Sequence, residues 1–125
     1  KVLRDDSGEV KSRIPYKDDY SRRSQIMLLG DSFSRIYQTD KPLSAGWISH
    51  IAYELNQPLS TIVNDGGAST LVREVLERKL LEARKNGRKT LLAGKKLVIW
   101  EFVERDLRFG AEGWKQINFF AQNDN

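Results

Sequence analysis

The 125-residue sequence has no cysteine, one histidine and three prolines. The lack of cysteine excludes disulfide bonds and cysteine-based metal sites, and it fits either the cytosol or a periplasmic protein without disulfides. No apolar run is long enough to span a bilayer, and the N-terminal residues lack the apolar core of a signal peptide. A histidine-dependent mechanism would have only His50 to draw on within this chain.

The apolar content of the chain is sufficient for one small domain. Hydrophobic residues make up 39% of the sequence, which predicts a folded domain with a real core. The chain starts at Lys1 and not at a methionine, so we expect a processed protein or an excised part of a longer one.

A net charge of +4 arises mainly in one basic stretch. Its basic residues are Arg78, Lys79, Arg84, Lys85, Arg88, Lys89, Lys95 and Lys96. A basic excess favours polyanionic partners, but Glu74, Glu77 and Glu82 are interleaved with it at helical spacing. We therefore expect a solvated helix face and no nucleic-acid partner.

Hydrophobic patterns predict strands that alternate with helices. The predicted strands cover 26–29, 60–63 and 97–103, and the last is apolar enough to be central and buried on both faces. Apolar residues at helical spacing predict one helix over 45–55 and a longer one from Leu71 to a stop at Asn86-Gly87.

The segment before the first of these strands has a different character. Turn residues at 5–8 lie between short apolar segments, which predicts a hairpin or an extended arm over 1–24. Pro15 and the charged residues 16–23 then form a connector. Residues 25–125 are expected to form the α/β domain itself.

Parallel strands joined by right-handed crossovers are expected from this order of elements, so all three strands end at one edge. Open α/β sheets bind ligands at that edge. Ser32 follows the first strand, residues 64–67 follow the second, and Glu104 with Arg105 follows the third. These residues are therefore predicted to converge.

Ser32 is the candidate nucleophile among them. A serine that attacks an acyl carbon needs a base, a group that orients the base, and donors for the oxyanion. Gly66 and Gly67 are candidate oxyanion donors, although they equally describe an ordinary turn. Asp31 is expected to cap a helix, and His50 is a poor base because it lies within a helical pattern.

Other polar and aromatic residues allow substrate contacts at this edge. Arg105 suits forked contacts with a carboxylate, with Glu104 beside it and Asn64 on the neighbouring turn, but structural ion pairing is an equal alternative. Trp100 is expected to pack in the core, which leaves Trp114 free to contact a sugar ring.

Four segments carry a family resemblance. They read Leu-Leu-Gly-Asp-Ser-Phe-Ser at 28–34, Asn-Asp-Gly-Gly-Ala at 64–68, Leu-Ala-Gly-Lys-Lys-Leu-Val-Ile-Trp-Glu-Phe at 92–102 and Glu-Arg-Asp-Leu at 104–107. In this order they resemble the SGNH-like domain of the alginate O-acetyltransferases, periplasmic proteins that acetylate exopolysaccharides. The resemblance implies a three-layer α/β/α sandwich with a mainly parallel sheet, of which this chain is a partial, C-terminal portion.

The resemblance also implies a reaction. Ser32 would form an acetyl-enzyme and pass the acetyl group to a hydroxyl of an acidic, alginate-like polysaccharide, without a metal or another cofactor. The donor would be a protein such as a membrane O-acyltransferase. In that family an Asp-x-His motif upstream of the serine supplies the base, and this sequence has no such motif. We therefore expect the motif in the part of the parent protein before Lys1.

One further departure concerns the oxyanion donors. SGNH hydrolases usually carry a Gly-x-Asn block after the third strand, where this chain has Phe-Val-Glu-Arg at 102–105. Tyr37, just after the nucleophile turn, is a candidate replacement. Three alternatives to the transferase stay open: an SGNH-type acetyl esterase, a non-catalytic polysaccharide-binding module and, least favoured, a basic nucleic-acid-binding domain.

Overall fold

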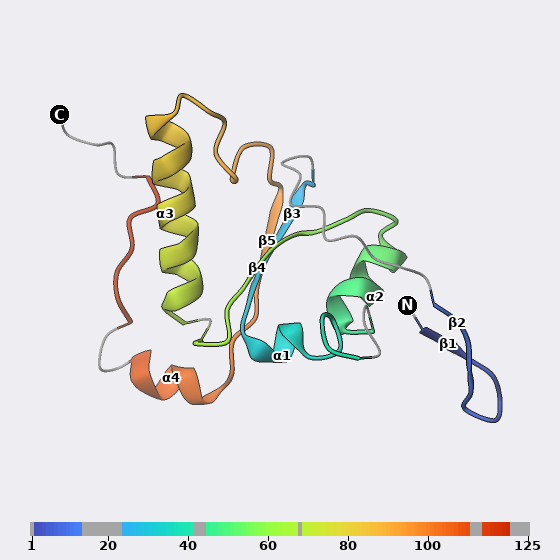
Figure 1. Cartoon of the computed structure of the whole chain (residues 1–125). Helices are drawn as coiled ribbons and strands as arrows, with labels where there is room; N and C mark the ends of the chain where they lie inside the picture. Colours follow the sequence, from blue (N-terminus) through green and yellow to red (C-terminus); the bar gives the residue numbers. More distant parts are fainter. Residues whose placement is uncertain (1, 14–23, 42–44, 68, 111–113, 121–125) are drawn as a thin grey trace.

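The computed structural model describes residues 2–13, 24–41, 45–67, 69–110 and 114–120. Its main sheet has three parallel strands in the order β4-β3-β5. The strands are β3 (Ile26–Gly30), β4 (Ser60–Val63) and β5 (Leu97–Trp100) (Figure 1). The predicted α/β class with a parallel sheet is thus confirmed.

Two helices pack on opposite faces of this sheet. On one face, α2 (Trp47–Glu54) places Ile48 and Ala52 against Ile26 and Leu28. On the other, α3 (Leu71–Lys85) packs Val72, Leu76 and Leu80 against Met27, Leu29 and Ile62. Successive side chains of a strand point to opposite faces, so the run Ile-Met-Leu-Leu in β3 supplies both clusters. Two short helices, α1 (Ser32–Arg35) and α4 (Arg105–Gly110), follow β3 and β5.

The last strand differs from its prediction in length and in place. β5 ends at Trp100, and it lies at the edge of the sheet while β3 occupies the centre. Leu97 and Val98 are 49% and 44% exposed, so the strand is not buried on both faces. After Trp100 the chain leaves the sheet, and only the amide of Glu101 still donates to Leu29 O, at 2.8 Å. An apolar run indicates a buried environment, but it does not give the position of the strand.

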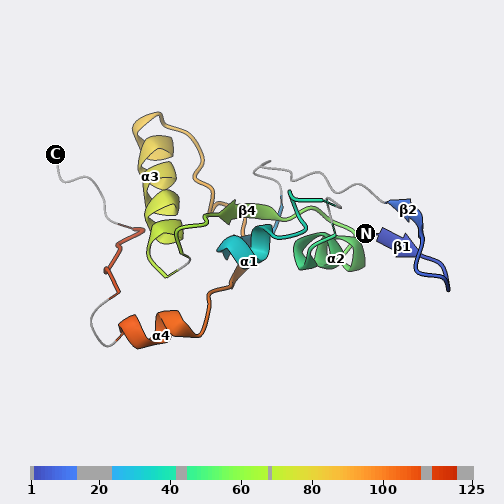
Figure 2. The same cartoon turned by 60° about the horizontal axis from the view of Figure 1, so that its bottom comes forward.

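Near the N-terminus the structure has a hairpin, one of the two forms expected for this segment. β1 (Val2–Arg4) pairs antiparallel with β2 (Val10–Arg13). The Asp5 side chain closes the turn, because its Oδ1 accepts from the amides of Ser7 and Glu9 at 2.9 and 3.1 Å. The hairpin lies on the α2 side of the molecule (Figures 1 and 2), and the predicted connector with Pro15 is outside the described residues.

Within the part of the chain that the structure describes, no helix has the length and apolarity needed to cross a bilayer.

The strand order predicts unequal costs for truncating two apolar strand residues. Leu28 in β3 is fully buried, so Leu28→Ala should lower the free energy of unfolding by about 2–5 kcal/mol. Val98 in β5 is 44% exposed, so Val98→Ala should cost under about 1 kcal/mol, the span of strand propensities. Urea unfolding followed by circular dichroism measures both. Equal costs would contradict the placement of β3 at the centre.

Candidate functional site at the carboxyl edge of the sheet

The strand order defines where a ligand site would form. The chain passes from β3 through α2 to β4, and then through α3 to β5 on the other side of β3. The first connection therefore runs from β3 to β4, and the second runs in the opposite direction, from β4 past β3 to β5. In open α/β sheets, ligands bind in the crevice beside such a switch point, beyond the carboxyl ends of the strands. Here β3 leads into α1, and β5 leads into the segment that continues to α4 (Figure 1).

Ser32 is the first residue of α1, directly after the turn that ends β3. Its side chain is partly exposed, whereas the neighbouring Asp31 and Ser34 are buried. Asp31 Oδ1 accepts from the amide of Phe33 at 2.8 Å, which confirms Asp31 as the cap of this helix. A serine hydroxyl is thus presented at the carboxyl end of the central strand.

Glu101, directly after the end of β5, contacts this turn. Its Oε2 accepts from the amide of Asp31 at 3.1 Å and from Ser34 Oγ at 2.6 Å. Gly30 leaves room for these contacts, because a Cβ built there would overlap the Ser34 side chain and lie 3.1 Å from Glu101 Oε2. Sequence reasoning did not single out Glu101. The available signal was its position as the first polar residue after the apolar run 97–100.

Asp31 lies in an acidic environment. Burial raises the pKa of Asp31, and the negative charges of Glu101 and Asp106 raise it further, while the hydrogen bond from Phe33 opposes the shift. Asp106 is itself buried, and among the described residues its Oδ2 has no hydrogen-bond partner. The surroundings of Asp31 therefore oppose its ionisation.

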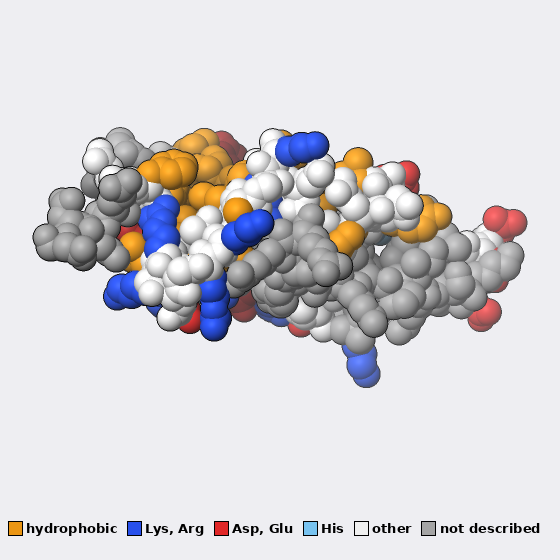
Figure 3. Space-filling view, turned by 90° about the horizontal axis from the view of Figure 1, so that it is seen from above, with side chains coloured by type: hydrophobic (Ala, Val, Ile, Leu, Met, Phe, Trp, Pro, Cys, Tyr) orange, Lys and Arg blue, Asp and Glu red, His pale blue; other side chains and the backbone are white. Residues whose placement is uncertain are grey.

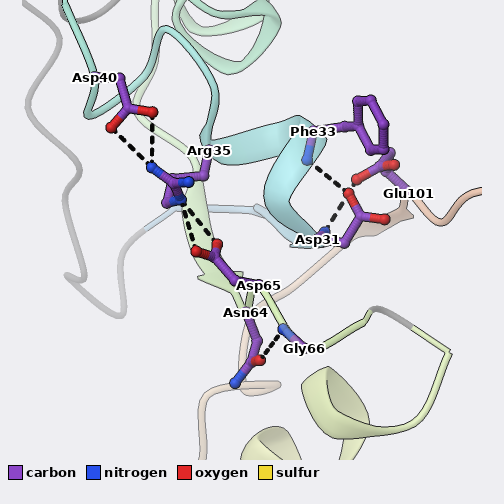
Figure 4. Close-up of polar contacts among 8 residues, drawn as sticks. All are labelled: Asp31, Phe33, Arg35, Asp40, Asn64, Asp65, Gly66 and Glu101. Carbon is purple, nitrogen blue, oxygen red and sulfur yellow. Dashed lines mark hydrogen bonds and ion pairs between the residues drawn. The ribbon is translucent and has the colours of Figure 1, made fainter.

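The turn after β4 reaches the same region through Arg35 of α1 (Figure 4). Arg35 Nε donates to both carboxylate oxygens of Asp65, at 2.8 and 3.1 Å. Arg35 Nη1 donates to both oxygens of Asp40, each at 2.8 Å. The predicted convergence of the Ser32 turn with residues 64–67 is therefore present, although an arginine joins them.

Gly66 and Gly67 use their amides within their own turn. Gly66 N donates to Asn64 Oδ1 at 2.7 Å, and Gly67 N donates to Asn64 O at 3.3 Å. Gly67 has a φ of 119°, which favours glycine, and a Cβ at Gly66 would overlap the Leu71 side chain. The turn thus accounts for both glycines and for Asn64, and their roles in oxyanion or substrate binding stay predictions.

The remaining candidates lie on exposed surface. Glu104 precedes α4 and Arg105 begins it, and both side chains are exposed. Tyr37 follows α1 with a φ of 60°, and its side chain is 56% exposed. His50 is exposed on α2, and no hydrogen bond joins it to Ser32 in the described residues. The roles considered for these residues stay predictions.

Trp114 is not free, contrary to expectation. Its ring packs edge-on against Trp100 and Phe102, with centroids 5.3 and 5.4 Å away. Its Nε1 donates to the main-chain oxygen of Asp106 at 2.8 Å, and the Arg73 guanidinium lies 5.7 Å from its ring centre. Trp114 itself therefore contacts β5, α3 and α4.

The basic stretch lies at the opposite edge of the sheet, where α3 ends. Figure 3 views this end of the molecule and shows several Lys and Arg side chains on it. A small hollow of about 160 Å³ is present there. Its lining residues are Lys79, Glu82, Ala83, Asn86, Arg88, Lys89 and Leu91. Most basic side chains of this stretch are exposed, which agrees with a solvated helix face. The stretch lies at the opposite end of the strands from Ser32.

No family model, curated protein or solved structure matches this chain. Among the described residues, no group of three or more histidine or acidic side chains could hold a metal ion.

The environment of Asp31 predicts how Asp31→Asn changes stability with pH. Since the folded-state pKa lies above the unfolded value of about 3.8, ionised Asp31 destabilises the native state at neutral pH. Asparagine keeps the capping oxygen and removes the charge, so the variant should unfold at higher urea concentration than wild type at pH 7. This advantage should shrink as the pH falls towards 3.8. A difference that is independent of pH would contradict the prediction.

Proposed function

We propose that this chain carries the nucleophile of a serine-dependent O-acetyltransferase that acts on an acidic, alginate-like exopolysaccharide. The observation that supports it most is the presentation of Ser32, partly exposed, at the carboxyl end of the central parallel strand. The Gly-Asp-Ser-Phe-Ser and Trp-Glu-Phe segments resemble the alginate O-acetyltransferases, and Glu101 of the second segment contacts the first. In this proposal the small α/β fold is part of an SGNH-like domain.

The proposed reaction has two steps, and both take place at Ser32 Oγ. Ser32 Oγ attacks the carbonyl carbon of the acetyl donor while a general base takes the serine proton, and the base then gives this proton to the leaving group as its bond to the acetyl carbon breaks. In the second step a hydroxyl of the polysaccharide attacks the acetyl-serine and gives its proton to the same base. The base returns that proton to Ser32 Oγ as the bond between the acetyl carbon and the serine breaks. Both steps pass through a tetrahedral oxyanion, which needs hydrogen-bond donors near Ser32.

Two partners complete the proposal. The resemblance supplies the base as an Asp-x-His motif upstream of the serine, so we place it in the parent protein before Lys1. It also places the reaction in the periplasm, with an acetyl donor protein such as a membrane O-acyltransferase. Neither partner changes the role of Ser32, which can be tested on this chain directly.

Incubation with an activated aryl acetate should place one acetyl group on Ser32. The expected mass increase is that of a single acetyl, located on the peptide that contains Ser32 by tandem mass spectrometry. Ser32→Ala should remove this label. The matched control is Ser7→Ala, because Ser7 is an exposed serine in the turn between β1 and β2, and this variant should keep the label on Ser32. Acetylation that persists in Ser32→Ala would overturn the proposal.

Addition of the upstream segment should raise the rate of acetyl-ester turnover by several orders of magnitude. A serine site that lacks one triad member retains only ~10³–10⁴-fold catalysis over water. The comparison needs the 125-residue chain, a longer protein and the Ser32→Ala form of each. Equal rates in the chain and the longer protein would overturn the upstream origin of the base.

The same measurements separate the alternatives. An acetyl esterase would acetylate Ser32 but release acetate in the presence of the polysaccharide, without modifying it. A polysaccharide-binding module would bind the polymer and leave Ser32 unlabelled.

A further inference from the structure

We propose that Glu101 is the positioning residue of the Ser32 turn, and that it fixes the nucleophile through Asp31 and Ser34. This inference rests on the proposed function of Ser32. Glu101 does not contact the reacting atom in this arrangement. Its Oε2 accepts hydrogen bonds from one residue on each side of Ser32, and lies 3.1 Å from Asp31 N and 2.6 Å from Ser34 Oγ.

The first step of the argument concerns the length of α1. This helix has only four residues, so its own backbone hydrogen bonds do little to hold its start in place. Ser32 lies between two residues that share one carboxylate oxygen as acceptor. Glu101 therefore restrains the segment that contains Ser32 through the main chain of Asp31 and the side chain of Ser34.

The second step concerns the space around the carboxylate. Ser34 is fully buried, and its hydroxyl donates to Glu101 beneath the turn. Gly30 has no side chain where Ser34 and Glu101 meet, and a Cβ there would displace both. Gly30 at the end of β3, Ser34 in α1 and Glu101 directly after β5 thus fit together at this point.

The third step concerns the negative charge that Glu101 places next to Asp31. Glu101 lies beside the Asp31 carboxyl group (Figure 4), and its charge contributes to the raised pKa of Asp31. Glutamine would keep an acceptor oxygen for Asp31 N and Ser34 Oγ and remove the like charge. Alanine would remove the acceptor altogether. These two substitutions therefore separate the hydrogen bonds from the charge.

The experiment measures the rate of Ser32 acetylation by the aryl acetate in Glu101→Ala, Glu101→Gln and Glu104→Ala. Glu101→Ala should lower the rate by about 10- to 100-fold, because small displacements of a reacting group have effects of this size. Glu101→Gln should react close to wild type. Glu104→Ala is the matched control, since Glu104 is exposed three residues further on, and it should leave the rate unchanged.

A second measurement keeps the result interpretable. Hydrogen exchange of the Asp31 amide should be slow in wild type and Glu101→Gln and fast in Glu101→Ala, with α3 amides protected in all three as a test of folding. Equal acetylation rates in wild type and Glu101→Ala would overturn the positioning role and leave the proposed function intact. A loss of rate in Glu101→Gln equal to that in Glu101→Ala would also overturn it. Absence of Ser32 acetylation both in this chain and in the longer protein with the upstream segment would overturn the proposed function and this inference together.

Discussion

The pairing of β3 with a strand on each side is the constraint on which the rest of the structure depends. Because β4 and β5 both hydrogen-bond to β3, all five of its residues are buried and its apolar side chains face two helix layers. The chain must also leave the sheet between two neighbours. Asp65 then approaches the following turn from the β4 side, and Glu101 approaches it from the β5 side. The surroundings of Ser32 are therefore a consequence of strand order.

Elements with a clear local pattern could be predicted from the sequence. The β-branched run at 60–63 is a strand with the predicted bounds, and the long helix ends at Lys85, just before Asn86-Gly87. The place of the apolar segment after Lys96 in the order of the strands could not be predicted. A short apolar strand has the same composition at an edge as in the centre when helix and loop side chains cover part of it. β5 is such a strand, since Trp100 packs with Phe102 and Trp114.

The same distinction between local and long-range contacts applies to the residues of the candidate site. Ser32 and the helix cap Asp31 could be predicted because the end of the strand and the start of the helix are both indicated by adjacent residues in the sequence. Glu101 could not, because its contacts are with residues 70 and 67 positions away in the sequence. The contacts of Trp114 could not be predicted either. Trp114 was expected to be free to contact a sugar ring, because only the fold brings it into contact with Trp100 and Asp106.

The division of the core by β3 has a consequence for sequence change. Leu28 belongs to the cluster under α2, and Leu29 belongs to the cluster under α3, with the sheet between them. Substitutions on opposite faces share no partners, so their effects on stability should add, whereas substitutions within one face should be coupled. Each layer can therefore be repacked separately, and the sequence around the Gly-Asp-Ser turn is free to stay the same while either helix diverges.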